Sequence, residues 1–139
     1  MCHPIIVYGL EDARAALAAA ERLGCAVTLV SAPAAAAHGG AGWFRALVEA
    51  AALSHPGVAV TAVLDCADLP GLVLGAVRAG VHHLRFSGSS ETAARLAAIA
   101  ASAGATLHSG GTWAGPALDL RGVTDPAAAC REWLSTYAA

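Results

Sequence analysis

Residues 58–94 constrain the fold more than any other part of the chain. Residues 58–64 form a run of apolar and β-branched residues, and residues 69–78 carry apolar residues at helical spacing. Gly80 ends this second segment, and residues 81–86 form another mostly apolar run. A strand, a helix and a second strand make a crossover unit, in which the strands are parallel and the connection is right-handed. The stretch therefore predicts an α/β protein.

The rest of the chain repeats this alternation. Strands are expected at 4–8, 25–30, 58–64, 81–86 and 105–108, and helices at 11–23, 43–52, 69–78, 90–102 and 125–136. The pattern predicts one domain over residues 1–139, a doubly wound parallel sheet of about five strands with helices on both faces. An incomplete (β/α) barrel is the alternative, because local periodicity does not distinguish the two. In both, ligands bind at the carboxyl ends of the strands.

Composition excludes several classes of protein. The long uncharged stretch of residues 23–44 is interrupted by proline and glycine, whereas a membrane-spanning helix needs about 20 continuous apolar residues. The first residues lack the features of a secretory signal, so a cytoplasmic protein without a membrane partner is expected. A net charge of −2 without a basic cluster argues against a nucleic-acid partner. All eight basic residues are arginine, and a chain without lysine forms no Schiff base and no phosphate-binding P-loop.

The four cysteines show no paired spacing and are expected to be thiols rather than ligands of a zinc ribbon or finger. Asp65 and Cys66 directly follow the strand expected at 58–64, where an α/β protein builds its site. A carboxylate beside a thiol could act as a general base or a metal ligand. Alternatively, Asp65 or Asp68 caps the following helix.

Histidines add a second possible group. His108 ends the last expected strand and could reach the same edge as Asp65, as acid or base. Asp65, Cys66 and His108 would form a metal or acid–base cluster only if their strands are neighbours. His82 and His83 face opposite sides of a strand, so they cannot serve one site together. Their simpler interpretation is one histidine under a helix and one near the surface.

Two loops have the chemistry of an anion site. Ser87, Gly88, Ser89 and Ser90 precede a helix, where backbone N–H groups and the helix dipole attract a phosphate or carboxylate, and Arg85 adds positive charge. Gly110, Gly111 and Trp113 belong to a second glycine-rich loop whose indole could stack on a ligand. The alternative for both is an ordinary turn with a serine cap. Neither loop matches a dinucleotide or nucleoside-triphosphate motif, so these two ligands are not indicated, and the sequence leaves the cofactor unknown.

Residues 58–94 also resemble the second half of a response-regulator receiver domain. The residues that carry the resemblance are Arg78, Ala79 and Gly80 between helix and strand. In that alignment Asp65 stands where the family has a hydroxyl residue, and Ser87 and Gly88 stand where it has Lys-Pro. The resemblance implies a flavodoxin-like fold. It implies no phosphotransfer, because the family's lysine is absent.

Three functional hypotheses follow. The first is a small regulatory or binding module, receiver-like in fold, that holds a small anionic ligand or a protein partner at the carboxyl edge of the sheet. The second is a lyase or isomerase acting on a small phosphorylated or carboxylate substrate, with Asp65 as base and His108 as acid. The third is a structural domain that forms homo-oligomers, supported by the apolar stripe of Trp133, Leu134 and Tyr137 on the last expected helix.

Overall fold

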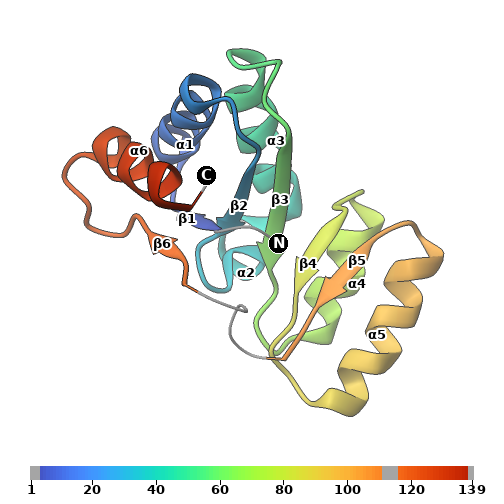
Figure 1. The fold of residues 1–139 in the computed structure, drawn as a ribbon. Helices are drawn as coiled ribbons and strands as arrows, with labels where there is room; N and C mark the ends of the chain where they lie inside the picture. Colours follow the sequence, from blue (N-terminus) through green and yellow to red (C-terminus); the bar gives the residue numbers. More distant parts are fainter. Residues whose placement is uncertain (1–3, 111–115, 138–139) are drawn as a thin grey trace.

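The computed structural model describes residues 4–110 and 116–137, in which strands and helices alternate (Figure 1). The strands are β1 (Ile5–Val7), β2 (Val27–Ser31), β3 (Val60–Asp65), β4 (His83–Arg85), β5 (Thr106–His108) and β6 (Leu118–Asp119). The helices are α1 (Leu10–Leu23), α2 (Ala35–His38), α3 (Gly40–Leu53), α4 (Pro70–Arg78), α5 (Ser90–Ser102) and α6 (Pro126–Tyr137). No helix in this described part of the chain is long and apolar enough to cross a membrane.

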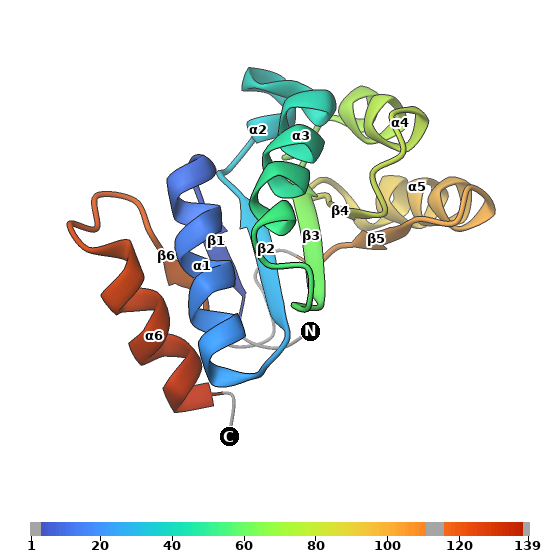
Figure 2. The same cartoon turned by 90° about the horizontal axis from the view of Figure 1, so that it is seen from above.

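All six strands form one parallel sheet in the order β5-β4-β3-β2-β1-β6. Figure 2 shows this order across the molecule. The first five strands are therefore neighbours in chain order, and β6 returns to pair with β1 on the far side. The prediction of an α/β protein with a single parallel sheet is confirmed. The sequential order matches the incomplete (β/α) barrel alternative, because flavodoxin-like sheets have the order 2-1-3-4-5.

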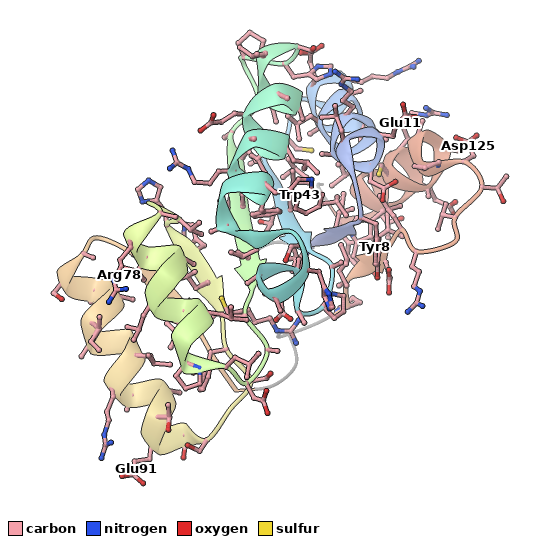
Figure 3. All side chains as sticks on the ribbon, turned by 180° about the vertical axis from the view of Figure 1, so that it is seen from behind. Tyr8, Glu11, Trp43, Arg78, Glu91 and Asp125 are labelled. Carbon is pink, nitrogen blue, oxygen red and sulfur yellow. The ribbon has the colours of Figure 1, made fainter. Side chains whose placement is uncertain are left out.

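The helices form one layer on one face of the sheet rather than covering both faces. Strands that advance in one direction through right-handed crossovers place every connecting helix on the same side. Accordingly, α6 packs on α1, α1 on α3, α3 on α4 and α4 on α5. Seen from behind, α1, α3 and α4 lie in front of the strands (Figure 3). Of the two arrangements expected from the sequence, this single layer agrees with the incomplete (β/α) barrel rather than with the doubly wound sheet.

The main core lies between the helix layer and the sheet. Helix α1 buries Ala13, Ala16, Leu17 and Ala20, which recur at helical spacing, and its small side chains let the helix approach the strands closely. Glu11 and Asp12 lie in its first turn, where acidic groups suit the helix dipole, and Gly24 ends it in the left-handed conformation. The largest fully buried side chains of the strand layer include Ile5, Leu29, Leu64, Leu84 and Phe86. This packing holds the carboxyl ends of the strands in register.

The opposite side of the sheet, called the inner face below, carries the alternate strand residues. Residues paired in register share a face, which assigns to it Ile6, Tyr8, Thr28, Val30, Thr61, Val63, Asp65, His83, Arg85, Thr106, His108 and Asp119. Val30 and Val63 are fully buried at its centre. Most of the others are polar. The inner face therefore combines an apolar centre with titratable groups toward both edges.

Some elements were not expected from the sequence. Between the strand expected at 25–30 and the helix expected at 43–52, the structure contains the short helix α2 and the start of α3 at Gly40. Strand β6 has two residues, too few to show a period. The apolar stripe of the last helix is partly buried against α1, because Leu134 is buried and α6 contacts α1. Part of the surface suggested for self-association is thus used inside the domain.

Candidate functional site

The carboxyl ends of β3, β4 and β5 place three predicted site residues in one row. Asp65, Arg85 and His108 are register partners on these neighbouring strands. Strands are spaced about 4.8 Å apart, so the backbones of Asp65 and His108 are about 10 Å apart, with β4 between them. The two residues of the expected acid–base pair therefore lie on the same edge but not on adjacent strands.

The side chains of His83 and His108 are in direct contact. The Nδ1 atom of His83 lies 3.1 Å from Nε2 of His108, within the range of an N–H···N hydrogen bond. The two rings are stacked, with centroids 5.4 Å apart and an interplanar angle of 20°. Sequence reasoning assigned His83 a structural role. Its position two residues before Arg85, and hence on the same face, was the signal that could have identified it.

Both imidazoles are held in the neutral form at neutral pH. Burial lowers the pKa of His83 below the usual 6.5, and His82 lowers it further. Burial lowers the pKa of His108 in the same way, and the neighbouring His83 adds to this effect. A neutral imidazole carries one N–H donor and one acceptor nitrogen. The pair can therefore donate and accept a proton without changing its net charge.

Asp65 forms its hydrogen bonds with residues at the end of β2 and in the turn that follows it. Its Oδ2 accepts a 2.6 Å hydrogen bond from the backbone N–H of Ala34, and its own N–H donates to Ser31 Oγ at 2.8 Å. Ala34 has a φ of 57°, a left-handed conformation that an alanine adopts only when its surroundings hold it there. Helix α4 has no side-chain cap, so Asp65 fixes the turn after β2 rather than capping the helix that follows it.

Replacing Asp65 with alanine is expected to lower the free energy of unfolding by about 1–3 kcal/mol, because the partly buried N–H of Ala34 loses a hydrogen bond to a carboxylate. Asp65→Asn keeps an acceptor oxygen and should lose less. Asp68→Ala, at an exposed position three residues on, is the matched control. Urea unfolding followed by circular dichroism measures all three. Equal stability of Asp65→Ala and Asp68→Ala would contradict the assigned role.

The structure places Cys66 away from the inner face. Its side chain is fully buried in the core with Leu64 and Phe86, and burial, with the nearby Asp65, raises its thiol pKa to about 12. A neutral buried thiol is a poor nucleophile and a poor metal ligand. Cys25 and Cys130 are also free thiols, as expected. The proposed cluster of Asp65, Cys66 and His108 is therefore not formed.

The loop before α5 has a local structural explanation. Ser89 Oγ accepts a hydrogen bond from Thr92 N at 3.3 Å and caps the helix, while Ser87 N donates to Ala67 O at 2.8 Å. A Cβ atom at Gly88 would lie 2.3 Å from the Phe86 ring. Gly88 is thus required by the packing of a buried aromatic ring, and Ser90 is the first residue of α5. These observations favour the interpretation of this segment as a capped turn.

Gly88→Ala is expected to destabilise the protein by about 1–3 kcal/mol, because the added methyl group forces a rigid, buried ring to move. Gly71→Ala is a suitable comparison, since nothing lies within 4 Å of a Cβ at that position. Thermal unfolding of the two variants measures the difference. An unchanged melting temperature for Gly88→Ala would contradict the packing argument.

The second predicted loop is only partly described. Gly110 has a φ of 99°, which a glycine adopts readily. Gly111 and Trp113 lie outside the described residues, and their predicted role in ligand binding stays a prediction.

A further polar pair on the inner face was missed by sequence reasoning. The pKa of Tyr8 is raised to about 12 by burial, and then by its hydrogen bond to the Asp119 carboxylate. Tyr8 follows β1 and Asp119 ends β6, so the two lie at the opposite end of the strand order from His83 and His108. The tyrosine directly before Gly9 at a strand end was the available signal. Its raised pKa keeps the hydroxyl protonated as a hydrogen-bond donor at neutral pH.

Within residues 4–110 and 116–137, no group of three or more His, Cys, Asp or Glu side chains is arranged to hold a metal ion. The inner face carries the paired histidines His83 and His108, whose ring nitrogens can donate and accept hydrogen bonds.

Comparison with known proteins finds a similar fold among solved structures but shows no family. No protein-family model matches the chain, and no curated protein matches it in sequence. Among solved structures, it is similar to a protein of Coccidioides immitis to which a fructose-1,6-biphosphate aldolase activity is ascribed, with a TM-score of 0.62 and 23% sequence identity. The match covers 78% of this chain and 40% of that chain. The chain thus shares its fold with part of a larger protein.

Proposed function

We propose that the inner face is an acid–base site of a lyase or isomerase that acts on a small carbonyl compound carrying a carboxylate or phosphate. The observation that carries this proposal is the 3.1 Å contact between Nδ1 of His83, the first residue of β4, and Nε2 of His108, the last residue of β5. Arg85, between the strands of Asp65 and His108, provides positive charge on the same face for an anionic substrate. His83 takes the place of Asp65 in the acid–base pair expected from the sequence.

The shared hydrogen bond defines how the pair moves a proton. If His83 Nδ1–H donates to His108 Nε2, then His83 Nε2 is a base and His108 Nδ1–H is an acid. The base takes a proton from the carbon next to the substrate carbonyl. The bridging proton moves to His108, and Nδ1 gives its proton to the carbonyl oxygen. An enol forms, both rings stay neutral, and the pair ends in the opposite tautomer.

This scheme agrees with the chemistry available to the chain. Aldol cleavage and isomerisation both require proton transfer at a carbonyl substrate, and the structurally similar fungal protein is described as an aldolase. A Schiff-base route is excluded because the chain has no lysine. Neutral imidazoles with a lowered pKa are suited to removing a proton at neutral pH.

Hydrogen–deuterium exchange at carbon tests the proposal without knowledge of the product. Pyruvate and dihydroxyacetone phosphate are incubated with the protein in D₂O, and loss of the C–H signals is followed by proton NMR. We expect exchange of at least one compound to be faster than in buffer alone. Exchange at the buffer rate for both would contradict a proton-transfer site for this substrate class.

Binding without catalysis is a second candidate, favoured by the position of Arg85 in the row of Asp65 and His108. In that case, pyruvate or dihydroxyacetone phosphate shifts amide signals of β4 and β5 in a heteronuclear NMR spectrum, but no carbon-bound proton exchanges. Loss of these shifts in Arg85→Met, with His55→Ala unchanged, would support an anion-binding module. Unchanged spectra for both compounds would count against it.

A further inference from the structure

A groove lies between α3, the first residues of β3 and the segment 80–83, which leads from α4 into β4, and it reaches His82 and His83. It has a volume of about 430 Å³, which is in the range of small-molecule sites. Its lining includes Phe44, Val48, Val60, Ala62 and Val81. Figure 3 shows α3 and α4 side by side above this part of the sheet.

Part of strand β3 is accessible at the bottom of the groove, although the central strands of parallel sheets are normally covered. Strand β3 is central in the sheet, and strands of a parallel sheet are usually buried on both faces. Val60 and Ala62 are nevertheless only half-buried on the helix side. The cause is the short helix α4, which ends at Arg78, before it covers the first residues of β3. The floor is therefore apolar, accessible and formed by rigid elements.

Two opposite charges stand at the rim. Arg45 and Glu49 are one turn apart on α3, and their side chains meet at 3.4 Å, a long ion pair. Arg45 also donates to the carbonyl of Ala79 at the end of α4. These contacts use two of the five guanidinium N–H donors, and both side chains are about half or more exposed. The rim thus presents a fixed cation and a carboxylate to a ligand.

We propose that this groove binds a free α-amino acid with a branched apolar side chain. The ligand carboxylate lies against Arg45, its ammonium group lies against Glu49, and its side chain covers Val60 and Ala62. A monocarboxylate would meet repulsion from Glu49, and a simple amine would meet repulsion from Arg45. A zwitterion satisfies both charges, which is why we choose this class. The proposal rests on Arg45, Glu49, Val60 and Ala62 rather than on the function assigned to the inner face, although His83 also lines the groove.

Isothermal titration calorimetry tests it with three probes of the same shape, namely L-leucine, 4-methylpentanoate and 3-methylbutylamine. We expect L-leucine to bind tightest, and each single-charge probe to bind about three- to tenfold more weakly because it loses one partly exposed ion pair. Arg45→Met should remove the advantage of L-leucine over the amine. Glu49→Gln should remove its advantage over the carboxylate.

The ion pair of Arg95 and Glu91 on α5 provides the matched controls. It has the same spacing, with a contact of 3.0 Å, and lies outside the groove. Arg95→Met and Glu91→Gln should leave L-leucine binding unchanged. Ala62→Leu, which fills the floor, should abolish it. Equal affinity for all three probes, no binding of any, or equal effects of the α3 and α5 variants would each overturn the proposal.

Discussion

Replacing His108 with alanine is expected to slow carbon-bound proton exchange by about 10²–10⁴-fold, the usual contribution of a positioned acid or base. The variant removes one of two rings that share a hydrogen bond, so the relay between the two outer nitrogens is lost. His83→Ala should have an effect of similar size, because each ring needs the other. The double variant should be little slower than either single one, since residues that act as a unit are not additive.

His55→Ala is the control for this experiment. His55 lies 3.0 Å from Glu21 in the segment between α3 and β3, at the amino ends of the strands. Its removal should leave the exchange rate unchanged. Exchange in His108→Ala at the wild-type rate, with the substrate still turning over, would show that the histidine pair is not the proton-transfer centre.

Replacing Phe86 with alanine is expected to lower the free energy of unfolding by about 3–5 kcal/mol, the range for a large buried aromatic residue. Phe86 is 1% exposed, lies in the core with Leu84, and covers Gly88. Its backbone N–H also donates to His108 O at 2.9 Å, which ties β4 to β5 below the histidine pair. Loss of the ring therefore leaves a cavity in the core, on the side of β4 opposite the proposed site.

Denaturant unfolding measures this effect, with Leu53→Ala as the control. Leu53 is 83% exposed, so its truncation should change stability by less than about 0.5 kcal/mol. If Phe86→Ala lost no more stability than Leu53→Ala, the core next to β4 and β5 would be packed differently from the structure described above.

The α/β class and the parallel sheet were predictable from the sequence because the longer strands and helices show a clear period. The β3–α4–β4 unit was visible in residues 58–94, and its boundaries moved by only one or two residues. The strand order was not predictable, since neighbouring strands are chosen by packing across the sheet. The two-residue strand β6 depends entirely on its pairing with β1. The receiver-like resemblance is not tested by these findings and stays a prediction.

The location of the site was easier to predict than its chemistry. Asp65, Arg85 and His108 were expected at the carboxyl edge and lie there in one row. The sequence predicts Asp65 as the acid–base partner of His108, because a carboxylate at the end of a strand is a common general base. In the structure, strand β4 lies between Asp65 and His108, and His83 of β4 contacts His108 instead. Distances between strands that are far apart in the sequence depend on the strand order, which local patterns do not contain.

A pH titration of the histidine rings by ¹⁵N NMR tests the central claim most directly. Burial and then the neighbouring His82 lower the pKa of His83, and burial and then His83 lower the pKa of His108. Burial dominates, so His83 and His108 should titrate below 6.5, and the pKa of His108 should rise in His83→Ala. Midpoints at or above 6.5, with His108 unaffected by the loss of His83, would contradict a neutral, coupled pair.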